Sequence, residues 1–375
     1  MFVAALELVD FRSWSLVQID LEPGVTVLVG RNGQGKTNIA EAIGYLATLG
    51  SHRVASDQPL VRRGAERAVV RAAVERLGRR LLLEIEIVPG KSNRARINKS
   101  PLPRSREMLG VLRAVVFAPE DLGLVRGDPD SRRGFLDDLM ILRTPRLAGV
   151  KSDYDRMLKQ RNALLKSAAA TRGSFDATTL TVWNDHLVQL GSEVLQARLA
   201  LVSELRAPVA KAYADLAPAG GDTGLDYKAS WCDGSPLDRL ASRGEIASEL
   251  RLALERVERE ELQRGVTLAG PHRDDLVLLL GDHPAKGYAS HGESWSMVLS
   301  LRLASFELLR ADGDDPVLIL DDVFAELDAT RRDRLAQMVG GAEQVLVTAA
   351  VAEDIPVTLS GSRFTVDSGQ VRREF

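Results

Sequence analysis

The sequence predicts an α/β fold whose sheet is assembled from both ends of the chain, with a mainly helical domain inserted between them. Short apolar runs typical of buried parallel strands lie at 25–29, 317–320 and 344–347. Between about 131 and 263, apolar residues recur instead at helical spacing. Since strands and helices alternate at both ends, we expect the two ends to share one α/β layer.

The composition is that of an ordinary folded protein, and it limits the possible chemistry. The 375 residues are enough for two or three globular units. With a net charge of −3, any nucleic-acid site must come from a local basic patch. The single cysteine, Cys232, excludes a disulfide framework and a cysteine-based zinc site. Neither a signal peptide nor a membrane span is apparent, so we expect a cytoplasmic location and no membrane partner.

A glycine-rich loop directly follows the first buried strand. Its residues are Gly30, Arg31, Asn32, Gly33, Gln34, Gly35, Lys36 and Thr37. Helical spacing continues through 38–49, and Gly50 stands where that helix is expected to end. In this strand–loop–helix order, backbone N–H groups and a helix N-terminus can bind phosphate. We therefore expect ATP here, with Lys36 reaching the β- and γ-phosphates and Thr37 binding Mg²⁺.

The next segment combines a predicted hairpin with a basic stretch. The runs at 68–76 and 81–88 have strand patterns, and the turn between them is expected at 78–80. From 89 to 113 there are seven basic residues and one acid, and 115–117 is a further apolar run. Such a charge run can be a solvated face. Its surplus, together with the resemblance described below, favours a DNA-backbone contact made by Lys91, Arg94, Arg96, Lys99, Arg104 and Arg106.

The middle of the chain is expected to be helical from about 131 to 263. Leu250, Leu254 and Val257, for example, fall on one face of a charged helix. The stretch 217–231 is rich in Gly and Pro and is expected to be a loop. No heptad repeat is sustained, so we expect no long coiled coil.

The apolar run at 317–320 ends in two acids, Asp321 and Asp322. Carboxylates commonly follow strand ends, so the pair alone has little specificity. Beside a phosphate loop, the first acid is expected to hold Mg²⁺ and the second to orient or deprotonate the attacking water. Lys36 and Asp321 are 285 positions apart, which fits a bipartite ATPase with an inserted domain better than a compact nucleotide kinase.

A helix expected at 294–310 is preceded by a serine–glycine element, Ser290-His291-Gly292-Glu293-Ser294. Small residues at a helix N-terminus can form an anion site. They can equally be a local cap, in which Ser290 or Ser294 satisfies free N–H groups. The residues alone leave both interpretations open.

The order of these elements resembles the ABC-type head of SMC-like ATPases, and its motifs resemble the RecF family more closely. The motifs are spread along the whole chain, at 8–12, 49–53, 117–122, 132–137, 158–162, 270–276 and 321–328. The resemblance implies a P-loop ABC-type ATPase head split between both chain ends, with a mainly helical inserted second domain. We expect the head at 1–125 and 266–375, and the insertion at 126–265.

The resemblance also implies a function, namely ATP-dependent DNA binding in recombinational gap repair and replication. Such proteins dimerise head to tail around two ATP molecules, and slow hydrolysis releases them. They are expected to bind single-strand gaps and duplex junctions and to help RecO and RecR load RecA. On this basis the chain is a weak DNA-linked ATPase that acts mainly as an ATP-gated DNA-binding factor.

Several residues acquire roles only through this resemblance. The implied nucleotide and dimer contacts are Ser290 and Gly292 on the γ-phosphate of the opposite subunit, Thr348 as the switch, 326–328 at the dimer contact, and His52 and Arg53 near the nucleotide. Two features depart from the family pattern. Glu293 replaces a common Gln and is expected to point away from phosphate. The chain has no unambiguous Q-loop glutamine, and either Gln58 or another group would fill that role.

Two other functions compete with this interpretation. The ATPase subunit of a transporter would couple to membrane domains and would need no basic patch. A small-molecule phosphotransferase would need neither the 285-position separation nor the serine–glycine element. Among single residues, His272 is expected to be structural or phosphate-facing rather than a metal ligand. Trp183, Trp231 and Trp295 are expected in the core rather than as base-stacking platforms.

Overall fold

The parallel sheet expected from the two chain ends is present in the computed structural model, which describes residues 1–170, 177–232 and 242–374. By contacts the chain divides into two units. Unit 1 consists of Met1–Arg126, Ala207–Asp222 and Ala289–Phe375, and unit 2 of Gly127–Arg206 and Thr223–Tyr288. The domain limits given above stay a prediction.

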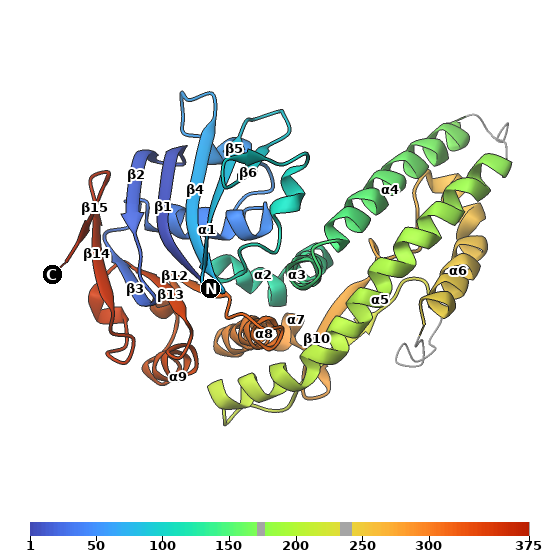
Figure 1. The fold of residues 1–375 in the computed structure, drawn as a ribbon. Helices are drawn as coiled ribbons and strands as arrows, with labels where there is room; N and C mark the ends of the chain where they lie inside the picture. The colour runs from blue at the N-terminus through green and yellow to red at the C-terminus, as the bar shows by residue number, and fades with distance from the viewer. Residues whose placement is uncertain (171–176, 233–241, 375) are drawn as a thin grey trace. The chain divides into compact units, whose positions relative to one another are not determined.

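The central sheet of unit 1 has the strand order β15-β14-β3-β13-β12-β8 (Figure 1). Its strands are β3 (Gly24–Val29), β8 (Ala114–Phe117), β12 (Val317–Asp321), β13 (Gln344–Ala349), β14 (Ser362–Asp367) and β15 (Gln370–Arg373). Only the β14–β15 pair is antiparallel. Every residue of β12 and β13 is buried, as expected for parallel strands covered on both faces. The strands predicted near both ends of the chain are thus confirmed.

The second sheet of unit 1 is antiparallel, in the order β2-β1-β4-β5-β6-β7. Its strands are β1 (Phe2–Phe11), β2 (Trp14–Asp20), β4 (Ala68–Arg76), β5 (Arg79–Ile87), β6 (Arg94–Ile97) and β7 (Ser100–Pro101). The predicted hairpin is β4–β5, but the turn expected at 78–80 is wrong. Leu77 and Gly78 form it, with φ of 50° and 71°, because a two-residue hairpin turn needs positive φ.

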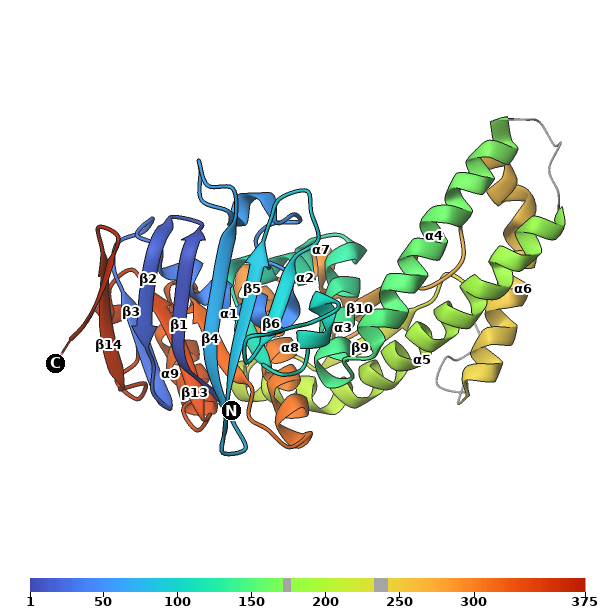
Figure 2. The same cartoon turned by 45° about the horizontal axis from the view of Figure 1, so that its top comes forward.

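Helices complete unit 1. They are α1 (Lys36–Thr48), α2 (Leu122–Arg126), α8 (His291–Ala311) and α9 (Ala329–Val339). Helix α1 contacts β13, β12 and β8 of one sheet and β4 of the other, so it lies between the two (Figure 2). Its left-handed C-terminal residue is Leu49, at φ 57°, rather than the expected Gly50.

Unit 2 is mainly helical, as predicted. Its helices are α3 (Pro129–Arg143), α4 (Leu147–Ala170), α6 (Arg243–Arg264), the short α7 (Ala285–Tyr288) and most of α5 (Ala177–Leu216), whose last residues belong to unit 1. None of the described helices combines the length and apolar content that crossing a lipid bilayer requires.

A small antiparallel sheet in unit 2 corrects two expectations. Its order is β11 (His283–Pro284), β10 (Asp275–Leu280) and β9 (Thr223–Lys228). Strand β9 lies inside the stretch 217–231 that we expected to be a loop, because it is stabilised by pairing with β10 along its length. We expected the strands and helices at both ends of the chain to share one α/β layer, but the two partners of β10 place this strand in the small sheet of unit 2 instead.

Candidate functional site

The phosphate loop joins β3 to α1, and two of its glycines are required by close approaches. A Cβ at Gly30 would lie 2.1 Å from the carbonyl oxygen of Val366. Gly35 has φ of 101°, and a Cβ there would lie 2.8 Å from the Trp14 ring, whose Nε1 donates to the Gly35 carbonyl at 3.1 Å. Trp14 is a supporting residue that sequence reasoning missed, since its contact with the loop is not local.

Lys36 is the first residue of α1, and only 3% of it is exposed. Its ammonium group donates to the carbonyl oxygens of Gly30 at 2.7 Å and Arg31 at 3.3 Å. The first turn of α1 has no acidic residue and no side-chain cap, so its N–H groups are available to an anion. The loop therefore presents a cation and free N–H groups together, which is the chemistry that binds phosphate.

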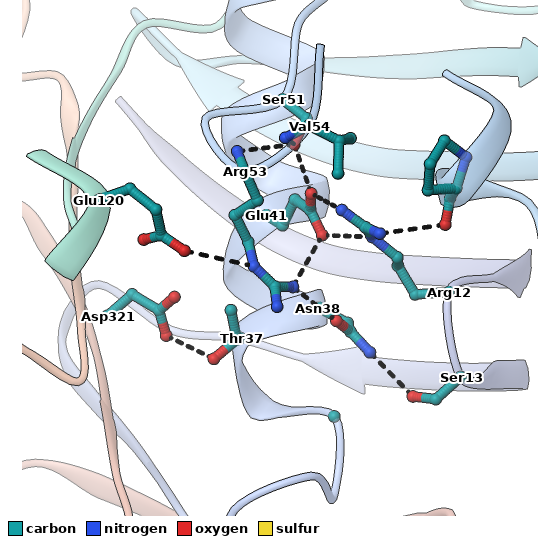
Figure 3. A network of polar contacts seen from close by, with 12 residues as sticks. Arg12, Ser13, Thr37, Asn38, Glu41, Ser51, Arg53, Val54, Glu120 and Asp321 are labelled. Atoms are coloured by element: carbon teal, nitrogen blue, oxygen red, sulfur yellow. Dashed lines mark hydrogen bonds and ion pairs between the residues drawn. The ribbon is translucent and has the colours of Figure 1, made fainter. Parts of the chain in front are cut away.

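Three oxygen-bearing side chains predicted for the site meet at the ends of β12 and β13. Asp321 Oδ1 accepts hydrogen bonds from Thr37 Oγ1 at 3.0 Å and from Thr348 Oγ1 at 2.6 Å (Figure 3 shows the Thr37 contact). Asp321 pairs with Thr348 in the strand register and is 2% exposed. Burial raises its pKa to about 6. We call these three residues the oxygen cluster.

The donor set of the oxygen cluster fits Mg²⁺. A hydroxyl and a carboxylate oxygen are the hard ligands that Mg²⁺ takes, usually with phosphate and water completing the shell. Asp321 and Thr37 are in hydrogen-bond contact, so one ion could be held by both.

The second acid, Asp322, follows a sharp change of backbone direction. Its φ is 51°, and its N–H donates to Thr348 Oγ1 at 3.0 Å. Its carboxylate makes no hydrogen bond or ion pair to any other described residue, and the side chain is half-buried. Asp322 is thus fixed by its backbone while its carboxylate is available to a ligand.

The serine–glycine element forms a local cap. Ser290 Oγ accepts from the Glu293 N–H at 3.3 Å, and Glu293 Oε2 accepts from the Ser290 N–H at 2.8 Å, a capping box. These hydrogen bonds lower the pKa of Glu293. The capping interpretation left open above is therefore present, and Glu293 is turned back toward Ser290.

Arg331, at the start of α9, lies against this element and was missed from sequence. A Cβ at Gly292 would lie 3.0 Å from its guanidinium, so a larger residue there would press on the end of this side chain. Arg331 donates to Ser296 Oγ at 3.0 Å and to the Asp328 carboxylate at 2.5 Å. His291 is exposed and lies 3.2 Å from an Arg126 guanidinium nitrogen.

A pocket of about 570 Å³ opens beside the cap, entirely within unit 1. Its polar lining includes Ser290, Glu293, Arg331 and Tyr213, whose hydroxyl is buried and has no hydrogen-bond partner among the described residues. The described contacts of Ser290 and Gly292 are with this surface and not with the phosphate loop.

A buried carboxylate on α1, Glu41, gathers a second polar network behind the phosphate loop (Figure 3). It accepts from Arg12, Ser51 and Arg53. Sequence reasoning placed Arg53 near the nucleotide but missed Glu41. The neighbouring His52 is half-buried; burial lowers its pKa, and its Nε2 has no described partner. Gln58 lies exposed on a short 3₁₀ turn, and its Q-loop role stays a prediction.

The basic set predicted to meet DNA lies on and around β6 at one edge of the antiparallel sheet. Arg94 and Arg96 share the exposed face of β6, while Ala95 between them is buried. Arg96 is paired with Glu84. Five members make no ion pair within the described chain: Lys91, Arg94, Lys99, Arg104 and Arg106. Arg113, in contrast, is buried and donates to a backbone carbonyl, so it is not part of this surface.

His272 and the tryptophans of the sequence differ in how far they are buried. His272, in unit 2, lies 2.7 Å from the Tyr154 hydroxyl and 3.2 Å from the Thr267 carbonyl, so both ring nitrogens have partners. Burial lowers its pKa to about 4. Trp231 and Trp295 are 1% exposed, which confirms them as core, and Trp183 is half-buried.

Known proteins that are similar to this chain in sequence carry the name RecF. The family model described as "RecF/RecN/SMC N terminal domain" matches residues 2–360. Proteins named DNA replication and repair protein RecF from Streptomyces avermitilis and Frankia alni are each 57% identical to it, with 100% of both chains covered. The protein of that name from Nocardioides sp. is 53% identical at the same coverage.

Solved structures show the same fold. A recombination mediator protein RecF with ATP, of the RecFOR pathway, has a TM-score of 0.90 at 24% identity, covering 100% of this chain and 98% of that one. An Smc head bound to the C-winged helix domain of ScpA has a TM-score of 0.57 at 16% identity, covering 100% and 97%. The ABC-type head expected from the sequence is thereby confirmed as a fold.

Proposed function

The chain belongs to the RecF family, and on that premise we propose that it is an ATP-dependent DNA-binding protein of recombinational gap repair and replication. One observation carries the nucleotide part of the proposal. The oxygen cluster joins Thr37 of the phosphate loop to Asp321 at the other end of the chain, in a hydrogen bond of 3.0 Å. Folding thus assembles a phosphate loop and a carboxylate strand end into one site.

ATP is proposed to bind with its phosphates over residues 30–37. Lys36 would exchange its two carbonyl partners for β- and γ-phosphate oxygens, a change that keeps the ammonium group hydrogen-bonded. Thr37 and Asp321 would hold Mg²⁺, which neutralises developing phosphate charge when bound. Asp322 would accept a hydrogen bond from the water that attacks the γ-phosphorus, and ADP would leave as the bond to the bridging oxygen breaks.

A second copy of the chain is proposed to complete the site. Ser290 and Gly292 would face the γ-phosphate held by the partner, in a head-to-tail dimer around two ATP molecules. The exposed position of Ser290 at a helix N-terminus supports this role. Thr348, through its contact with Asp321, is proposed as the switch residue.

DNA is proposed to bind the five unpaired cations around β6, with Arg96 beside them. Cations without ion-pair partners can neutralise phosphates without first breaking a salt bridge, and each contact releases counterions. Gaps and duplex junctions are the proposed DNA, and RecO, RecR and RecA the proposed partners in the cytoplasm. These assignments follow the family rather than any contact in this chain.

The similarity to proteins named DNA replication and repair protein RecF does not favour the alternative expected from the sequence, the ATPase subunit of a transporter. One experiment separates the two functions. Sedimentation velocity is measured with and without ATP, each with and without gapped DNA. We expect monomers without ATP, dimers with ATP, and a dimer–DNA complex only when both are present. An ATP-dependent dimer that ignores DNA at low salt would contradict the DNA function and favour the transporter class.

A further inference from the structure

We propose that Glu41 is a positioning residue that holds the guanidinium of Arg53 at the metal-binding end of the phosphate loop, where Arg53 binds the terminal phosphate of ATP. The inference rests on the proposed function and adds to it the residue that selects ATP over ADP. Glu41 would act through Arg53 and not by touching the nucleotide itself.

The carboxylate of Glu41 is fully used. Oε1 accepts from Arg12 NH2 and Ser51 Oγ, each at 2.5 Å. Oε2 accepts from Arg12 Nε at 2.7 Å and from Arg53 NH1 at 3.3 Å. Its side chain is 0% exposed, so a charge in this position requires such partners.

Arg12 and Arg53 differ in the number and length of their hydrogen bonds to Glu41, and this difference gives each arginine a different role. Arg12 donates one hydrogen bond to each oxygen of the carboxylate and another to the Pro59 carbonyl at 3.1 Å, so it anchors Glu41. Arg53 has a single, longer bond to Glu41 and a side chain that is 31% exposed. The anchored carboxylate thus fixes one side of Arg53 and leaves the rest of the guanidinium accessible.

The backbone conformation of Arg12 indicates that the fold holds this residue in place for its contact with Glu41. Its φ is 55°, a left-handed conformation that costs free energy for a residue with a side chain. Its N–H donates to the Leu60 carbonyl at 2.7 Å, which holds it there. Such a conformation persists only where the surroundings enforce it.

Two further contacts direct Arg53 toward the nucleotide. Its NH1 donates at 3.1 Å to Asn38, the residue that follows Thr37. Its Nε lies 3.7 Å from Glu120, whose charge in turn acts on Asp321. Figure 3 shows the guanidinium between the Glu41 carboxylate and the Thr37–Asp321 pair. Its second terminal nitrogen makes no hydrogen bond to a described residue and is available to a phosphate oxygen.

The test is a double-mutant cycle on nucleotide selectivity in the full-length protein. Affinities for ATP and ADP, each with Mg²⁺, are measured by titration calorimetry for wild type, Glu41→Gln, Arg53→Ala and the double variant. Each single variant should lose ATP affinity by roughly tenfold, the effect of one hydrogen bond to a charged group, and keep ADP affinity within about twofold. Glu41→Gln should then add almost nothing in the Arg53→Ala background.

The matched control is Asp314→Asn. Asp314 accepts from Arg76 Nε at 2.9 Å and precedes β12, whereas Asp321 ends that strand. The control therefore removes an arginine–carboxylate pair about 20 Å from the site. It should not change the ATP-to-ADP affinity ratio. Melting temperatures of all variants separate folding from selectivity.

Three outcomes overturn the inference. Equal losses for ATP and ADP, or an undiminished Glu41→Gln effect in the Arg53→Ala background, would make Glu41 structural only. If Glu41→Gln does not fold, unchanged selectivity in the exposed Arg53→Ala variant is decisive against it. Failure of wild type to bind either nucleotide would instead contradict the proposed function.

Discussion

The phosphate-loop side and the serine–glycine side of unit 1 each present a helix N-terminus at which we propose that an anion binds, but the two are built differently. On the first side, Lys36 and Asp321 are 3% and 2% exposed, and residues from three elements are hydrogen-bonded together. On the second, Ser290 is exposed and its hydrogen bonds stay within its own helix start. On the phosphate-loop side the fold of a single chain brings distant residues together. On the serine–glycine side the hydrogen bonds only cap the helix locally. This difference fits the proposal that the second side acts on a second copy of the chain.

Lys36→Ala tests the phosphate-loop side and should have the largest effect. The variant removes both charge-assisted hydrogen bonds proposed for phosphate, so ATP affinity should fall by roughly a thousandfold. Fluorescent-nucleotide titration measures it. Affinity close to that of wild type would remove Lys36 from the site.

Ser290→Arg tests the serine–glycine side. A bulky side chain at the exposed helix start should block the partner's γ-phosphate. ATP-driven dimerisation should then weaken by at least roughly a hundredfold, the size of effect seen when a residue at the centre of an interface is replaced. ATP binding by the monomer should stay within about twofold. Light scattering with ATP measures the dimer, and one of normal strength would rule this role out.

Asp322→Asn separates binding from turnover on the phosphate-loop side. The backbone of residue 322 holds its position through Thr348, so the amide should leave ATP binding intact while hydrolysis slows by roughly a hundredfold, the usual contribution of a positioned base. The ATP-bound dimer should last longer in consequence. Phosphate release measures turnover, and a wild-type rate would show that another group positions the water.

Charge reversal around β6 should have the smallest effect of the four changes, because these residues belong to neither the phosphate-loop side nor the serine–glycine side. Arg94→Glu with Arg104→Glu removes two unpaired cations and should flatten the slope of log K against log salt by about two units. Arg79→Glu with Arg80→Glu, at the hairpin end of β5, carries the same charge change and should leave the slope unaltered. Identical slopes for the two double variants would make the β6 set a solvated face.

The same contrast explains what could be predicted from sequence. The glycine loop and the Asp321–Asp322 pair are local patterns, so they could be identified from the sequence alone. The shared role of Thr37 and Asp321 at Mg²⁺ was expected from these two motifs, but their hydrogen bond depends on the order of the parallel strands, which spacing along the chain does not give. Strand β9 was missed because only its pairing with β10 distinguishes it from a loop.

Glu41 was missed although a signal was present. It stands between Ala40 and Ala42 in a helix whose residues from Ile39 to Ala47 are all buried. A helix apolar on every side is buried, and a lone carboxylate inside it must find cationic partners. Which partners these are could not be predicted, because Arg12 and Arg53 come from separate segments.

Subunit mixing tests most directly the claim that one side is complete in the chain and the other serves a partner. Lys36→Ala and Ser290→Arg proteins are each assayed alone and then mixed in equal amounts, with ATP hydrolysis and dimer formation measured together. A mixed dimer has one site with both defects and one with neither. We expect each variant to be inactive alone and mixing to restore hydrolysis at up to one site per mixed dimer. Inactive mixtures, with both variants folded, would contradict this expectation and place Ser290 in the site of its own chain.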